Sequence, residues 1–141
     1  HLTEEKCKSF VNQKLTGVLF IHNQNIVHLN ITPYNIIFKN KVRRKYLDII
    51  HNNLTILSLQ DFNDELKIID FAHSTQLSSE QEAIKLPRLQ GTLEYLSPEV
   101  LNCENVGKPA DIWSVGVITY MLVTGGVSPF YAGIRLKKMK R

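Results

Sequence analysis

Two polar residues beside short apolar segments carry side chains that can bind a hard metal ion. Asn35 directly precedes the apolar run 36–38, and Asp70 directly follows the run 66–69. Amide and carboxylate oxygens are the ligands that Mg²⁺ takes in proteins. Taken singly, both residues have an ordinary structural explanation, Asp70 as a turn residue at a strand end and Asn35 as part of an Asx turn. The segments around them decide between the two interpretations.

An amphipathic helix is predicted near the start of the chain. Thr3 is a capping residue, and Glu4 and Glu5 follow it at the positive end of the helix dipole. The helix is expected to stop at residues 23–25, after which residues 26–27 form a short extended segment. Apolar residues recur with helical spacing at Cys7, Phe10, Val11, Leu15, Val18, Leu19 and Ile21.

A β-hairpin is predicted next, because residues 36–38 and 66–69 are short apolar runs. Residues 39–65 between them make a connection far longer than the about two to five residues that hairpins prefer, so we interpret this segment as an insertion. Residues 70–96 are polar and irregular, which predicts a long surface loop.

Two further helices are expected in the last third of the chain. Ser97 as cap and Pro98 at the first position predict one short helix ending near residue 101. Residues 109–123 are apolar on nearly every face and should form a helix buried all round, with Gly125 and Gly126 as its stop. Only seventeen residues follow Thr124, so we expect an incomplete core.

Five motifs follow one another along the chain, and in this order they resemble a protein kinase of the serine/threonine type. The likeness within that family is to the calmodulin-kinase group, around the death-associated and myosin light chain kinases. It covers residues 1–134 apart from the insertion and leaves 135–141 as a basic tail. The motifs are His28-Leu29-Asn30-Ile31-Thr32-Pro33-Tyr34-Asn35, Asp70-Phe71-Ala72, Gly91-Thr92, Ser97-Pro98-Glu99 and Asp111-Ile112-Trp113-Ser114-Val115-Gly116.

The resemblance implies a fold, cofactors and partners. The fold is α+β, the mainly helical lower lobe of a kinase domain with a short β-hairpin, and we expect it to be incomplete at both ends. The implied cofactors are ATP and Mg²⁺, with Asn35 and Asp70 as metal and cofactor ligands. Since the Gly-rich phosphate loop and its strand lysine do not occur in these residues, tight ATP binding by this chain alone is not expected. The implied partner is a protein substrate or another protein.

Departures from the family pattern predict impaired catalysis. Asn30 stands at the position of the catalytic aspartate, and an amide cannot accept the substrate's proton, which costs on the order of 10²–10⁴ in rate. Thr32 replaces the lysine that balances charge on the transferred phosphoryl group. Thr92 matches the residue that bonds this aspartate and this lysine, so we expect it to lack both partners.

Other positions carry structural expectations from the same resemblance. Asp111 should brace the backbone of the catalytic loop, with Trp113 packed beneath it. Leu29 replaces an arginine that binds an activation-loop phosphate, so phosphorylation need not switch this segment. His28 is expected to be a packed structural histidine, and Glu99 to lack its arginine partner.

Three functional interpretations remain. The chain is part of a serine/threonine kinase-like domain with impaired catalysis, a pseudokinase that acts as a protein-binding scaffold, or a vestigial fragment that does not fold stably. A net charge of +4 and a pI near 9.1 raise nucleic acid as a partner. However, ten of the seventeen basic residues lie in 39–45 and 135–141, and the remaining chain carries −6, so nucleic acid is not expected. No segment is apolar over a bilayer's width, and two cysteines favour a reducing, cytoplasmic location.

Overall fold

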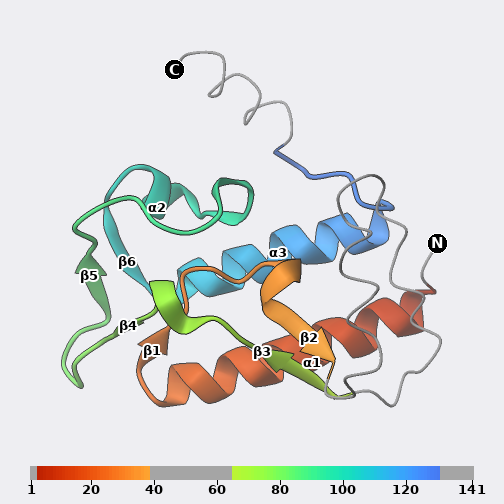
Figure 1. The fold of residues 1–141 in the computed structure, drawn as a ribbon, viewed down its shortest axis with the longest axis horizontal. Coiled ribbons are helices and arrows are strands. Elements are labelled where there is room, and N and C mark those ends of the chain that lie inside the picture. Colours follow the sequence, from red (N-terminus) through yellow and green to blue (C-terminus); the bar gives the residue numbers. More distant parts are fainter. Residues whose placement is uncertain (1–2, 39–64, 131–141) are drawn as a thin grey trace.

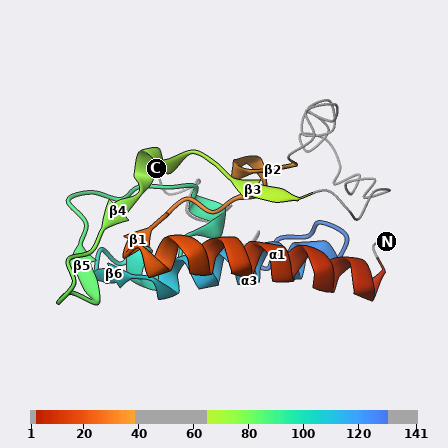
Figure 2. The same cartoon turned by 90° about the horizontal axis from the view of Figure 1, so that it is seen from below.

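Two long helices pack side by side and run in opposite directions (Figure 1, Figure 2). They are α1 (Glu4–Asn23) and α3 (Pro109–Val123). The computed structural model describes residues 3–38 and 65–130. It confirms the α+β class expected from the sequence. No helix among the described residues has both the length and the apolar character needed to cross a membrane.

Helix α1 is amphipathic as predicted, but its buried face differs from the predicted one. The buried side chains follow a spacing of three and four residues, and Lys14 is among them with 1% exposure. Leu15 and Leu19, predicted on that face, are 39% and 60% exposed. Thr3 stands at the N-cap position, yet its side chain makes no capping hydrogen bond. The two acids of the first turn are therefore the favourable charges at this helix end.

The described residues form three antiparallel strand pairs. The predicted hairpin is confirmed: β2 (Ile36–Phe38) pairs with β3 (Leu66–Ile68), with Ile36 opposite Ile68, although Ile69 lies outside the strand. The insertion that joins them lies outside the described residues except for Glu65. The other pairs are β1 (Ile26–Val27) with β4 (Thr75–Gln76), and β5 (Ala83–Lys85) with β6 (Asn105–Gly107).

The segment 70–96 is more ordered than the predicted surface loop. It contains β4, β5 and two short 3₁₀ helices, Phe71–His73 and Leu93–Tyr95. Its few apolar side chains anchor it, because Leu77, Tyr95 and Leu96 are buried. Composition over the whole segment concealed these isolated anchors, so the prediction of an irregular loop was wrong.

The short helix α2 (Pro98–Leu101) forms where it was predicted. Ser97 is at its N-cap position, but its side-chain oxygen is buried without a hydrogen bond. The expected capping bond is therefore absent.

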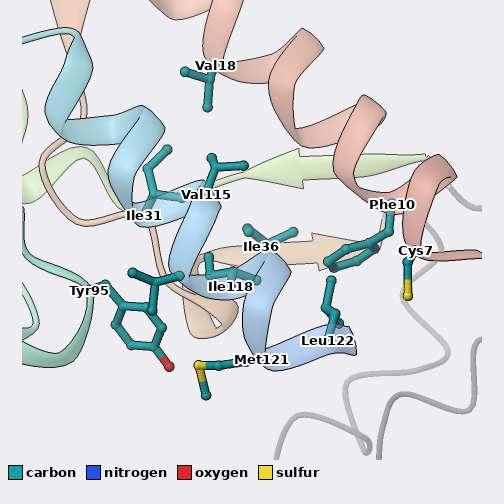
Figure 3. Packing of buried hydrophobic residues seen from close by; sticks show 11 residues of the cluster. Cys7, Phe10, Val18, Ile31, Ile36, Tyr95, Val115, Ile118, Met121 and Leu122 are labelled. Carbon is teal, nitrogen blue, oxygen red and sulfur yellow. The ribbon is translucent and has the colours of Figure 1, made fainter. Parts of the chain in front are cut away.

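Helix α3 is buried on one side and exposed on the other among the described residues. Val115, Ile118 and Leu122 point into a core shared with α1 and β2, where Phe10 lies beside them (Figure 3). Ile112 and Val123, in contrast, are 47% and 60% exposed. The prediction of a helix buried all round was therefore wrong for the described part of the chain.

Candidate active site

The carboxylate of Asp111 holds the first part of the loop of residues 28–35 in place. Its two oxygens accept the backbone N–H groups of His28 and Leu29, each at 2.8 Å, and the ring nitrogen Nε2 of His22 at 2.8 Å. Asp111 is fully buried, so these bonds replace the water that the carboxylate loses. The expected bracing of the loop by Asp111 is confirmed in this geometry.

The backbone at Leu29 takes a rare conformation that this bonding maintains. Leu29 has φ +63°, a left-handed value that costs an ordinary residue about 1–3 kcal/mol. Its carbonyl oxygen lies against Gly91, where an added Cβ would come within 2.5 Å of it. Gly91 itself has φ +94°. A glycine is therefore required at residue 91 for the two loops to approach each other.

Asn30 and Thr92 meet across this approach. The side-chain oxygen Oδ1 of Asn30 accepts the backbone N–H of Thr92 at 3.1 Å and its hydroxyl at 2.9 Å. Because a backbone N–H can only donate, the atom facing it must be the amide oxygen, which fixes the orientation of the Asn30 side chain. The expectation that Thr92 lacks its partner at residue 30 was wrong, since an amide oxygen accepts these bonds as a carboxylate oxygen does.

Asn35 and Asp70 are brought next to each other by the end of the hairpin. The N–H of Ile69 donates to the carbonyl of Asn35 at 2.9 Å, and His28 bonds the carbonyl of Ile69 through Nε2 at 3.1 Å. Asp70 follows directly, with φ +66°, and one of its oxygens accepts the N–H of Ala72 at 3.3 Å. The Asn35 amide nitrogen donates to the Asn30 carbonyl at 2.9 Å.

These bonds leave one oxygen of Asp70 and the amide oxygen of Asn35 without a hydrogen bond among the described residues. A carboxylate and an amide oxygen fit Mg²⁺ in kind. No group of three His, Cys, Asp or Glu side chains in residues 3–38 and 65–130 could hold a metal. A cation at Asp70 and Asn35 would therefore take most of its ligands from water or from a bound phosphate.

His28 is a packed structural residue, as expected. It is fully buried, and its Nδ1 accepts the N–H of Asn30 at 3.3 Å while Nε2 bonds Ile69. One neutral tautomer, with the proton on Nε2, satisfies both bonds. Phe71 covers the ring, with centroids 4.8 Å apart.

Thr32 is also buried, with 1% exposure, and it brings no charge to the site. Trp113 differs from its prediction: it is 37% exposed and stacks on Phe130, with ring centroids 5.4 Å apart. Glu99 is half-buried and forms no ion pair among the described residues.

Two contributors to the site were not predicted. His22 bonds Asp111 from the last turn of α1, and the backbone of Ile69 orients Asp70. His22 lies in the last turn of α1, and its partner Asp111 follows 89 residues later in the sequence. Helical spacing within α1 therefore gave no sign of its role. The backbone bonds of Ile69 depend on tertiary folding and leave no residue-type signal at all.

The comparison with protein families agrees with this geometry. The family profile described as "Protein kinase domain" matches residues 1–141. The chain belongs to the protein kinase family. The loop of residues 28–35, the strand end at Asp70 and helix α3 are therefore kinase elements, which confirms the resemblance found in the five motifs.

The chain is similar to several individual protein kinases. Smooth muscle myosin light chain kinase of Gallus gallus is 39% identical over 129 residues, and human death-associated protein kinase 2 is 34% identical over 129 residues. Human myosin light chain kinase 2 of skeletal and cardiac muscle is 36% identical over 130 residues. Each match covers 92% of this chain but only 6%, 29% and 18% of the respective relative. The chain thus spans less than a third of these kinases.

Proposed function

We propose that this chain is the part of a serine/threonine protein kinase domain that carries the catalytic and metal-binding loops, and that its phosphoryl transfer is impaired. The family uses ATP and Mg²⁺ to phosphorylate proteins, and these are the proposed cofactors and substrate class. The free cysteines Cys7 and Cys103 and the net charge of −6 outside the two basic runs support a cytoplasmic location and a protein, rather than nucleic acid, as partner.

The orientation of the Asn30 side chain carries this proposal. Its Oδ1 already accepts two bonds from Thr92, so the side-chain group left for a substrate is the amide nitrogen, which donates and cannot take a proton. A substrate hydroxyl at this point loses its general base. Thr32 adds to the loss, because a buried neutral hydroxyl cannot offset charge on a phosphoryl group.

The metal side of the site is better preserved than the base. The backbone bond from Ile69 to Asn35 brings Asp70 close to Asn35, and each has an oxygen without a hydrogen bond to the described residues, so these two residues would hold Mg²⁺. When bound there, Mg²⁺ supplies positive charge that offsets the charge of phosphate oxygens. A loop that holds metal and phosphate but lacks the base matches a binding domain better than an efficient transferase, and the pseudokinase interpretation is thus our second candidate.

A loop exchange tests the impairment in a complete enzyme. Residues 28–35 of this chain would replace the matching segment of death-associated protein kinase 2, and kcat and KM for a peptide substrate would be measured. We expect kcat to fall by about 10²–10⁴ with little change in the KM for ATP, because the base is lost and the metal ligands are kept.

Two controls complete the exchange. The same exchanged loop with Asn30→Asp and Thr32→Lys should recover most of the lost kcat. An exchanged enzyme with Asn30 that works within tenfold of its parent would refute the proposed impairment. The purified chain itself should show no transfer in ATP and Mg²⁺, and turnover that disappears in Asn30→Ala would count against the proposal.

A further inference from the structure

Asn30 is 9% exposed, and its side-chain nitrogen is an unused hydrogen-bond donor among the described residues. Every other polar atom of Asn30 has a partner: its N–H bonds His28, its carbonyl bonds Asn35 and its Oδ1 bonds Thr92 twice. Nδ2 makes no bond to the described residues. It is also not one of their buried orphan atoms, which are Lys14 Nζ and Ser97 Oγ. Its two N–H groups are therefore available to a ligand.

Because residue 30 is asparagine and not aspartate, its free side-chain atom is a hydrogen-bond donor and not an acceptor. An aspartate at residue 30 with one oxygen held by Thr92 would present its second oxygen, an acceptor, to the cleft. Asn30 presents two donors at the same point, and Thr92 keeps the amide from rotating because its backbone N–H must face an oxygen. The free Nδ2 donors of Asn30 therefore favour a ligand that offers acceptor atoms over one that offers a proton.

The neighbouring groups restrict which acceptor is suitable. Residues 28–35 contain no lysine or arginine, and Asp70, which follows the hairpin, brings an exposed carboxylate to the site. A bare anion would be repelled there. A phosphate that brings its own Mg²⁺ is complementary, since the cation suits the free oxygens of Asp70 and Asn35 and the phosphate oxygens suit Asn30.

We propose that this loop binds a phosphorylated serine or threonine side chain together with Mg²⁺, through the Nδ2 donors of Asn30, in preference to the unmodified hydroxyl. The inference rests on the proposed function, because it assigns the protein side of the kinase cleft to Asn30. It adds that the chain recognises the product of a kinase reaction. Hydrogen bonds to a charged phosphate are roughly twice as strong as those to a neutral hydroxyl. The loop should therefore bind the phosphorylated side chain more tightly than the unmodified one.

Binding by the full chain is the direct test. A fluorescein-labelled alanine peptide with one central phosphoserine would be titrated by fluorescence anisotropy, beside the same peptide with serine, in MgCl₂ and in EDTA. We expect the phosphopeptide to bind at least about tenfold more tightly than the serine peptide, and only with Mg²⁺. AMP and inorganic phosphate form parallel arms, because they carry phosphate without a peptide. Either one binding as tightly as the phosphopeptide would overturn the assignment to a phosphorylated side chain.

Variants assign the effect to Asn30. Asn30→Asp should weaken phosphopeptide binding at least about tenfold, since a carboxylate then faces the phosphate. The control is Asn12→Asp, the same change at an exposed asparagine of α1, which should leave the affinity unchanged. Unchanged phosphopeptide binding in Asn30→Asp would contradict the proposal.

A spectroscopic readout on the unmodified sequence keeps the test valid even if the variant folds poorly. In a chain labelled with ¹⁵N-asparagine, the side-chain NH₂ signals of Asn30, found by comparison with an Asn30→Gln chain, should shift on adding phosphopeptide and Mg²⁺. No shift at saturation would refute the contact. If the loop exchange gives the expected loss of kcat while the phosphopeptide shows no preference, this inference fails and the proposed function stands. If the exchanged enzyme remains fast, the proposed function fails, whatever the peptide does.

Discussion

Two ionisable side chains are buried against α1 and α3 in very different surroundings. Asp111 of α3 is fully buried and accepts three hydrogen bonds at 2.8 Å. Lys14 of α1 is 1% exposed, and its amine has no hydrogen-bond partner within residues 3–38 and 65–130. The amine lies 3.8 Å from the centre of the Phe10 ring, and Phe10 belongs to the hydrophobic core. One buried charge is thus fully compensated and the other is not.

This difference separates a functional buried charge from a costly one. The bonds of Asp111 fix the loop that carries Asn30, so the burial of this carboxylate stabilises the site. The burial of Lys14 instead lowers the pKa of its amine from 10.5 to about 6, with a smaller opposing effect of Cys7, and the side chain is mostly neutral at pH 7. Among the described residues, Cys7 is the ionisable group that acts on this amine, and the Phe10 ring beside the amine is apolar. Folding must therefore remove a proton from Lys14 and gains no bond in exchange.

Replacing Lys14 should have the largest effect. We expect Lys14→Met to raise the free energy of unfolding by roughly 3–5 kcal/mol at pH 7, because the cost of neutralising a buried amine disappears. Urea denaturation followed by circular dichroism measures this. Lys8→Met, at an exposed lysine paired with Glu4, is the matched control and should change stability by less than about 0.5 kcal/mol. An equal effect of both changes would remove the contrast between the two buried charges.

Changing Asp111 should have an effect of similar size and opposite sign. Asp111→Asn places an NH₂ group against at least one N–H that the carboxylate now accepts, so we expect a loss of about 3 kcal/mol. Asp70→Asn serves as control, since Asp70 is exposed and accepts one long bond within its own turn. Both stabilities follow from the same urea titrations. A loss confined to Asp70→Asn would contradict the role given to Asp111.

The smallest expected effect is the pH dependence that Lys14 adds. Between pH 6 and 10.5 the unfolded chain keeps the Lys14 proton while the folded chain loses it, so stability rises with pH. The contribution is about 1.4 kcal/mol for each pH unit, and it becomes constant below pH 6. The free energies of unfolding obtained from urea titrations at pH 6.5 and pH 8.5 should differ by about 2–3 kcal/mol more in the unmodified chain than in Lys14→Met. Parallel pH profiles for the two chains would show that Lys14 does not titrate in this range.

The same two residues show what the sequence can and cannot predict. Asp111 was identified because it belongs to a motif with fixed spacing from Trp113 and Gly116. Lys14 was missed because lysine is normally exposed, so the helical pattern placed Leu15 and Leu19 on the buried face. Hydrophobic periodicity reports what is usual for a residue type, and an exception becomes visible only when the neighbouring elements are in place.

The residues of the candidate site could be predicted from the sequence, but the contacts between them could not. Motif order predicted Asn30, Asn35, Asp70 and Thr92 as the residues of the site, and short apolar runs predicted the hairpin that carries Asp70. The bond from Thr92 to Asn30 joins residues 62 positions apart, and the free Nδ2 depends on that bond. No local pattern encodes such a contact, because it arises from the close approach of Gly91 to Leu29.

The bonds of Asp111 also have a consequence for the order of events during synthesis. They join His28, Leu29 and His22 to a carboxylate that follows them by 83, 82 and 89 residues. Ribosomes add roughly 5–20 residues per second, so the loop waits about 4–16 s before its carboxylate exists. During that interval nothing holds Leu29 in its left-handed conformation. The loop of residues 28–35 is thus expected to become ordered only after Asp111 has been synthesised, which leaves it open to chaperones and proteases in the meantime.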